Sequence, residues 1–165
     1  MNDVEAIAAL EHSVGNARRG LPEEVFLFIS RLTPMVNVDL LIKDKQRGTL
    51  LTWRDDEHFG PGWHIPGGII RFKEKMADRV RAVAQHELGT EVEFDPTPLA
   101  VHEIILPDQQ ERAHFIALLF RCVLRAPLDE TLRFKSGKPQ RGQWAWHECW
   151  PKEIIDIHRI YEPFA

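Results

Sequence analysis

The segment from Gly62 to Gly89 constrains the fold of this chain more than any other. It contains a Pro-Gly-Gly turn at positions 66–68, which follows a short stretch with Trp63 and Ile65. Apolar residues then recur at helical spacing, at Ala77, Val80, Ala84 and Leu88. Gly89 stands where a left-handed helix cap is expected. The pattern predicts a strand, a glycine loop and one helix. Glu87 on the last helical turn would face back toward the loop and could share a cation with Gly67.

The spacing of this segment resembles the box of the Nudix hydrolases, Gly-x5-Glu-x7-Arg-Glu-apolar-x-Glu-Glu-x-Gly. Five positions agree with the box, namely Gly68, Glu74, Ala84, Glu87 and Gly89. Three positions depart from it: Ala82 replaces the arginine, and Val83 and His86 replace two glutamates. Two of the family's usual metal carboxylates are therefore missing. We expect Glu74 to tie the loop to the helix, with Arg79 or Arg81 as its partner. His86 either replaces a metal carboxylate or lies on the solvated face of the helix.

Outside the box, the chain resembles one branch of that family, the GDP-mannose mannosyl hydrolases. The shared features are a segment like 32–39, an arginine placed like Arg54, the run Trp63-x-x-Pro-Gly-Gly68, the ending Glu87-Leu-Gly89, and a glutamine placed like Gln140 ahead of Trp146. This resemblance covers about residues 21 to 150. It implies the Nudix fold, an α/β/α sandwich with a mixed β-sheet. We expect one Nudix hydrolase domain over 21–165, preceded by an N-terminal helical extension over 1–20.

The same resemblance implies a site for Mg²⁺, with Mn²⁺ as the alternative. Its ligands would be the Gly67 carbonyl, Glu87 and Gln140. Arg54 would offer a guanidinium fork to phosphate oxygens. The expected substrate-binding residues are Asp39, Arg54, His58 and Phe115, and the expected catalytic residues are Glu87, Arg54 and Arg141. Asp39 also has a structural interpretation, because a carboxylate buried in an apolar strand is costly unless it has a partner such as a salt bridge.

One cation held by few protein ligands suits attack of water at the anomeric carbon, where the metal only neutralises the departing diphosphate. The expected substrate is therefore a nucleotide sugar such as GDP-mannose, split into GDP and sugar. Two alternatives stay open: cleavage of a nucleotide derivative at phosphorus, and a catalytically weak nucleotide-binding protein. The resembling enzymes have a basic histidine after the metal glutamine, whereas this chain has Arg141, which cannot give up a proton. Arg141 could instead contact a phosphate. The candidate replacement bases are His58, His64, His102 and His114.

Composition is that of an ordinary globular protein, with 44% hydrophobic and 28% charged residues in 165. A formal net charge of -4 argues against a general nucleic-acid binder. We find neither a signal-peptide pattern nor an apolar run of membrane-spanning length, so we expect a cytoplasmic protein without a membrane partner. Cys122 and Cys149 lack a Cys-x-x-Cys partner and are expected to be buried free thiols, with a disulfide as the alternative.

Periodicity and turn residues predict the remaining elements. The expected helices cover 1–19, 22–28 and 151–161, and the expected strands cover 35–42, 49–53, 92–94, 99–106 and 113–124, with a last strand through Trp144 and Trp146. The strands at 35–42 and 49–53 should form a hairpin, and the apolar run at 113–124 suits a strand buried on both faces. Residues 125–142 are expected to be a long irregular connection. In the resembling enzymes the N-terminal region contributes to a dimer, so we expect a homodimer.

Overall fold

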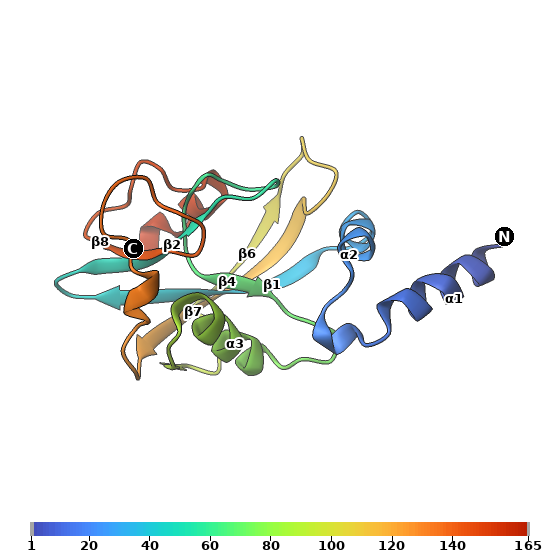
Figure 1. The fold of residues 1–165 in the computed structure, drawn as a ribbon, viewed down its shortest axis with the longest axis horizontal. Helices are drawn as coiled ribbons and strands as arrows, with labels where there is room; N and C mark the ends of the chain where they lie inside the picture. The colour runs from blue at the N-terminus through green and yellow to red at the C-terminus, as the bar shows by residue number, and fades with distance from the viewer. Residues whose placement is uncertain (1, 165) are drawn as a thin grey trace.

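The computed structural model describes residues 2–164 and places a mixed sheet at the centre of the molecule. Its helices are α1 (Asp3–Val14), η1 (Ala17–Arg19), α2 (Glu23–Ser30), α3 (Met76–Leu88), η2 (Glu130–Leu132) and η3 (Asp156–Phe164), where η marks a 3₁₀ helix. Its strands are β1 (Met35–Asp44), β2 (Gly48–Arg54), β3 (Gly62–His64), β4 (Gly67–Ile69), β5 (Val92–Phe94), β6 (Ala100–Ile105), β7 (His114–Leu124) and β8 (Trp144–His147). Figure 1 shows their arrangement.

Strand β1 organises the sheet because it pairs with three other strands. It runs parallel to β7 over Met35–Ile42 and antiparallel to β2 at its C-terminal end, so the predicted hairpin is confirmed. Its N-terminal half pairs with β4, where Asp39 lies opposite Gly67. The full order is β3-β2-β1-β7-β5, with β6 on β7 and β8 on β2. The Pro-Gly-Gly loop is thereby fixed against the middle of β1.

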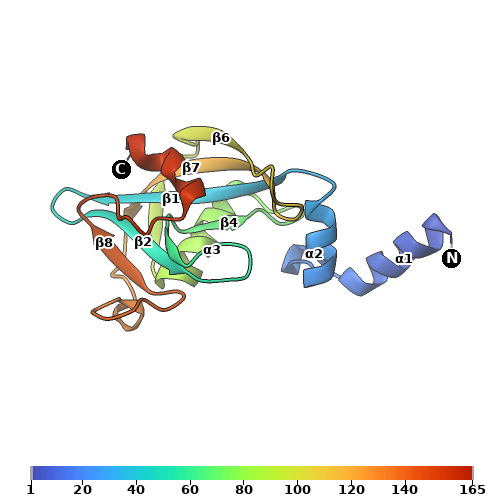
Figure 2. The ribbon, with the colours of Figure 1, turned by 90° about the horizontal axis from the view of Figure 1, so that it is seen from above.

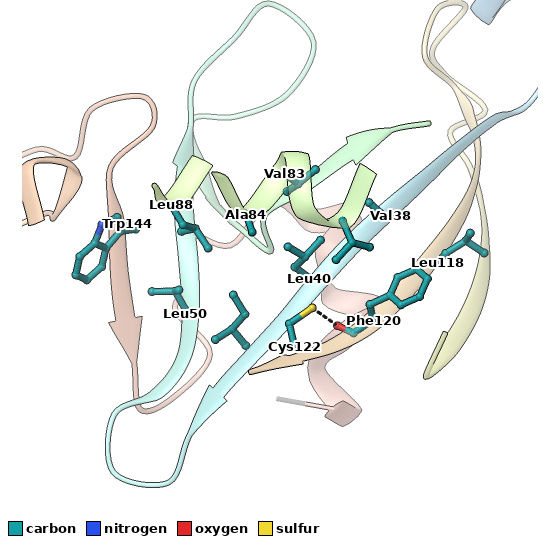
Figure 3. Close-up of a cluster of buried hydrophobic side chains, with 12 residues drawn as sticks. Val38, Leu40, Leu50, Val83, Ala84, Leu88, Leu118, Phe120, Cys122 and Trp144 are labelled. Atoms are coloured by element: carbon teal, nitrogen blue, oxygen red, sulfur yellow. Dashed lines mark hydrogen bonds between the residues drawn. The ribbon is translucent and has the colours of Figure 1, made fainter. Parts of the chain in front are cut away.

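Two layers cover the sheet, as the predicted α/β sandwich requires. On one face α3 packs Val80, Val83, Ala84 and Leu88 against β1 and β7 residues such as Leu40 and Phe120 (Figure 3). On the other face, Leu41 and Leu119 pack in a cluster with Tyr161 of η3. Figure 2 shows α3 and the C-terminal segment on opposite sides of β1. Residues 117–120 of β7 are buried in succession, which confirms a strand covered on both faces.

The two ends of the chain differ from the predicted helices. The first α-helix ends at Val14, because Gly15 has φ 59° and Asn16 caps the short helix η1. The C-terminal α-helix predicted over 151–161 is wrong: a turn leads to an isolated bridge at Ile154, the backbone groups of Glu153 and Ile155 bond to Trp63, and a 3₁₀ helix follows only from Asp156. The backbone groups of residues 153 and 155 therefore bond to β3 and are not available for the hydrogen bonds of a helical turn.

Helix α1 extends away from the sheet (Figures 1 and 2), and none of its described residues is buried. Within residues 2–164, no helix is both long and apolar enough to span a membrane. Both cysteines are free thiols, as predicted. Cys122 is buried in β7, but the expectation of a buried Cys149 is wrong, because that residue lies in the exposed turn after β8.

Candidate active site

A cavity of about 610 Å³ opens between the loop after β3, helix α3 and the two chain ends. It receives Asp39 from β1, Arg54 from the end of β2, Gly67 from β4, Glu87 from α3 and Tyr161 from η3. Of the residues predicted from the sequence, Phe115 and Arg141 also line it. The structure thus brings together six predicted site residues, which lie far apart in the chain.

Glu87 faces the Pro-Gly-Gly loop, as predicted from its place on the last turn of α3. Its Oε1 accepts a hydrogen bond from the Gly67 N–H at 3.2 Å, and its Oε2 accepts one from the Thr52 hydroxyl at 2.9 Å. Burial raises the pKa of the Glu87 carboxyl to about 7, although both hydrogen bonds act in the opposite direction. Both carboxyl oxygens of Glu87 are thus held in place, and among residues 2–164 no Lys or Arg side chain forms a salt bridge with them.

Asp39 is a second carboxyl group next to the same loop, and it is more deeply buried than Glu87, with only 3% of its surface exposed. Its Oδ2 accepts hydrogen bonds from the Tyr161 hydroxyl and from Asn37 Nδ2, the latter at 2.9 Å. Burial raises the pKa of Asp39 to about 7. No salt bridge to Asp39 occurs within residues 2–164, so the structural interpretation of this residue as a salt-bridged carboxylate is not supported.

The oxygen donors at this end of the cavity fit a hard cation. The two carboxyl groups flank the same glycine, because Asp39 lies opposite Gly67 in the β1–β4 pair and the Gly67 N–H donates to Glu87 Oε1. Mg²⁺ prefers such oxygen ligands and keeps several waters, so it does not need a complete protein cage. No group of three His, Cys, Asp or Glu side chains converges in the part of the chain that the structure describes. Gln140 is exposed and outside the cavity lining, although Arg141 and Gly142 belong to it.

Arg54 supplies positive charge to the lining of the cavity. Its Nε donates to Asp56 Oδ2, and its guanidinium carbon lies 4.6 Å from the centre of the Phe59 ring. The Phe59 ring in turn packs edge-on against Phe115 at 6.2 Å. His58, also predicted to bind substrate, lies outside the lining, and its backbone N–H donates to Asp56 Oδ1 at 2.9 Å. The loop that carries His58 therefore supports Arg54 through Asp56.

Of the four candidate bases, only His64 lines the cavity. Its Nε2 lies 3.0 Å from the Thr52 hydroxyl and 3.9 Å from Glu87 Oε2. Burial lowers the pKa of His64 to about 3, so its imidazole is neutral at physiological pH. His102 packs against Tyr161 and Phe164, and His114 lies beside Glu103 at 3.3 Å, both outside the cavity.

The loop between β4 and α3 is tied down by an ion pair. Arg79 donates to both carboxylate oxygens of Glu74, at 2.9 and 2.8 Å. This contact shows which of the two predicted arginines replaces the one missing at Ala82, since Arg81 pairs with Asp78 instead. His86 is exposed at the rim of the cavity.

Sequence reasoning missed several residues of this cavity. Thr52 and Tyr161 bond the two carboxylates, His158 Nδ1 accepts a hydrogen bond from the Ile65 N–H at 3.3 Å, and Arg112 adds a second guanidinium. None belongs to a local motif. The sequence offers one relevant signal, in the amphipathic C-terminal segment. His158 and Tyr161 are three residues apart there, so they lie on the same face of a 3₁₀ helix.

Comparison with known proteins identifies the fold of this chain. No family model matches the chain. The MutT Nudix hydrolase from Burkholderia pseudomallei has a similar structure, with a TM-score of 0.56 and 23% identity over 79% of this chain and 97% of that one. A Nudix-family hydrolase from Clostridium perfringens has a TM-score of 0.54 and 13% identity over 80% and 95% of the two chains. This chain has the Nudix fold.

A curated protein also matches part of this Nudix-fold chain. It is the low-salt glycan biosynthesis protein Agl8 of Haloferax volcanii, which is 33% identical over 75 residues. The match covers 46% of the present chain and 47% of Agl8, so the chain spans about half the length of that relative. The solved structures establish the architecture, and the Agl8 match adds sequence similarity over part of it.

Proposed function

We propose that this Nudix-fold chain is a metal-dependent hydrolase of nucleoside diphosphate sugars, which releases GDP and sugar by attack of water at the anomeric carbon. The observation that carries the proposal is the division of charge within one cavity. Two carboxyl groups, the buried Asp39 and the partly buried Glu87, lie beside Gly67, and guanidinium groups, including Arg54 and Arg141, line the same cavity. A diphosphate bound with a divalent cation matches both parts.

Glu87 and the Gly67 carbonyl would hold Mg²⁺ or Mn²⁺, and Gln140 is a further candidate from the exposed loop. When bound, the metal would neutralise the diphosphate as it leaves. Arg54 would donate its remaining N–H groups to phosphate oxygens while Asp56 holds its Nε in place. Phe59 and Phe115 would limit water beside the phosphates, because their rings form an apolar wall of the cavity.

The supply of carboxylates favours carbon over phosphorus as the site of attack. Apart from Asp39 and Glu87, the only carboxylate lining the cavity of the described chain is Asp56, which already pairs with Arg54. Residues 2–164 therefore offer no cluster that could hold several metal ions around a reacting phosphorus. The base that activates the water is to be sought between Asp39 and His64, because both line the cavity whereas His58, His102 and His114 do not.

A second candidate function is hydrolysis at phosphorus. Arg141 lines the cavity in place of the expected base and could stabilise a phosphoryl oxygen. A possible asymmetric diadenosine tetraphosphate hydrolase from Jonesia denitrificans also shares the fold, with a TM-score of 0.53. The glycan biosynthesis role in the name of Agl8 supports a sugar nucleotide instead.

Phosphorus NMR of GDP-mannose incubated with the protein and Mg²⁺ separates these functions. GDP with free sugar would support attack at carbon, and GMP with sugar phosphate would support attack at phosphorus. The same incubation in ¹⁸O-water would place the label on the sugar in the first case and on a phosphate in the second. No turnover of GDP-mannose, of other nucleotide sugars or of diadenosine tetraphosphate would refute both and leave a nucleotide-binding protein.

We also propose that residues 1–20 form an extension to a single hydrolase domain over 21–165, and that the protein is a homodimer. Apolar side chains are exposed on both N-terminal helices, among them Val4 (76%) and Ile7 (56%) on α1 and Ile29 (37%) on α2. A partner chain that covers them would remove this apolar area from water. Light scattering coupled to size-exclusion chromatography would give a dimer mass, and a monomer mass would contradict the proposal.

A further inference from the structure

Arg112 is an unpaired cation in the wall of the cavity. Among residues 2–164, no carboxylate forms a salt bridge with it, and its buried Nε has no hydrogen-bond partner. Its guanidinium carbon lies 5.6 Å from the centre of the Phe26 ring and 5.2 Å from that of Phe59. Aromatic faces attract a cation, but they leave its N–H donors unused. The guanidinium of Arg112 therefore has free hydrogen-bonding capacity inside the cavity.

A second guanidinium increases the local excess of positive charge. Arg54 also lies over the Phe59 ring, and after burial itself, the charge of Arg54 is the main cause that lowers the pKa of Arg112 to about 10. The acids that act on Arg112 are Asp56 and Glu23. Asp56 already accepts from Arg54 and from two backbone N–H groups. Two partly buried cations thus lie over one ring while the carboxylate beside them, Asp56, is already occupied, an arrangement that an added anion would stabilise.

The backbone holds Arg112 in place before any ligand arrives. Its φ is 52°, in the left-handed region that residues other than glycine rarely adopt. Its N–H donates to the hydroxyl of Ser30 at 3.0 Å, and that buried hydroxyl donates to the Leu27 carbonyl at 2.8 Å. The neighbouring residues Arg31 and Glu111 form an ion pair between α2 and the same loop. Helix α2 therefore fixes the backbone that carries Arg112, and the Phe26 and Phe59 rings flank its guanidinium, which together reduce the entropy lost on binding.

We propose that Arg112 and Arg54 form an oxyanion site at the α2 end of the cavity, which binds a phosphate or carboxylate group of the substrate. The two guanidinium groups share one aromatic neighbour, because the guanidinium carbons of Arg54 and Arg112 lie 4.6 Å and 5.2 Å from the centre of the Phe59 ring. The inference rests on the proposed function, because it assigns part of the substrate to that same cavity. The oxyanion is either one of the diphosphate groups or a carboxylate on the sugar.

Calorimetric titration with GDP, UDP-glucose and UDP-glucuronate tests the site without requiring turnover. We expect Arg112→Gln to weaken binding roughly ten- to hundredfold, because a hydrogen bond to a charged group is lost. An equal loss for all three ligands assigns the site to the diphosphate, and a loss confined to UDP-glucuronate assigns it to the sugar carboxylate. Unchanged affinity for all three would overturn the proposal.

Two further variants separate charge from fold. Arg112→Lys keeps the charge but not the planar fork, so we expect an intermediate loss of affinity. Arg121→Gln is the matched control, because Arg121 is exposed on β7 and outside the cavity. If no nucleotide is hydrolysed but Arg112→Gln still weakens GDP binding, the proposed function fails and the oxyanion site stands. If nucleotides are hydrolysed but Arg112→Gln leaves the affinity for all three ligands unchanged, the proposed function stands and the oxyanion site fails.

Discussion

Replacing Asp39 by asparagine should stabilise the folded protein at alkaline pH. The carboxyl group has an ordinary pKa of 3.8, which burial in β1 raises to about 7. A shift of this size corresponds to about 4 kcal/mol between the two protonation states. Asparagine has no charge to bury, and its side-chain oxygen can still accept the Tyr161 hydroxyl. Its amide nitrogen must fit beside Gly67, so we expect a net gain of about 2 to 4 kcal/mol near pH 8.

The gain must depend on pH in one direction. Below about pH 3.8 the carboxyl group is protonated in both the folded and the unfolded chain, and its contribution to stability is fully present. Between that value and about pH 7 only the unfolded chain ionises, so the free energy of unfolding falls as pH rises. The difference between Asp39→Asn and the unchanged protein should therefore be near zero at about pH 4 and reach its maximum above about pH 7.

Urea unfolding in EDTA at about pH 4 and about pH 8 measures the difference in the free energy of unfolding between Asp39→Asn and the unchanged protein. Asp44→Asn, on the same strand, is the matched control with the opposite sign. Asp44 is only half-buried, and its hydrogen bonds from Arg47 and from the backbone lower its pKa. Its replacement should not stabilise the protein at either pH. A gain for Asp39→Asn that is the same at both pH values, or no gain near pH 8, would refute the reasoning.

Three more variants probe the metal end of the cavity. Glu87→Gln should abolish Mg²⁺-dependent turnover, measured by phosphorus NMR, while the exposed control Glu91→Gln keeps it; undiminished activity would sink the metal assignment. Gly67→Ala should lower the free energy of unfolding by about 1 to 3 kcal/mol, because a Cβ there would lie 2.2 Å from Asp39 Oδ1 and 3.0 Å from the Val38 carbonyl oxygen. Gly68→Ala should cost less in the same urea assay, because its closest contact would be the Val83 methyl group at 2.8 Å. Tyr161→Phe removes a donor to Asp39 and should cost about 1 to 3 kcal/mol near pH 8; a smaller loss near pH 8 than near pH 4 would contradict this.

The segment from Gly62 to Gly89 was predictable because its structure is local. The apolar spacing fixes one buried face of α3, and Gly89 ends the helix with φ 60°. Glu87 then points to the loop for geometric reasons alone. The same holds for strand β7, because the run of consecutive apolar residues at its centre predicts burial on both faces. Here sequence periodicity and tertiary structure agree.

The rest of the cavity was not predictable, because its contacts join distant parts of the chain. Tyr161 bonds Asp39 across 122 positions, and no spacing along the sequence reports such a contact. Gln140 illustrates a different reason. In a loop without periodicity, nothing indicates which of two neighbours points inward, and it is Arg141 that lines the cavity while Gln140 is exposed. The position of Arg112 likewise depends on Ser30 in α2.

The cavity takes its walls from Ala17 near one end of the chain to Tyr161 near the other. It can exist only when strands, helices and both ends are assembled, so a ligand that fills it binds the folded chain and not the unfolded one. Such a ligand stabilises the whole protein, by about 2.7 kcal/mol at a concentration one hundred times its Kd. A bound substrate should therefore raise the melting temperature of the protein, and a panel of nucleotide sugars can be ranked by the increase that each one causes.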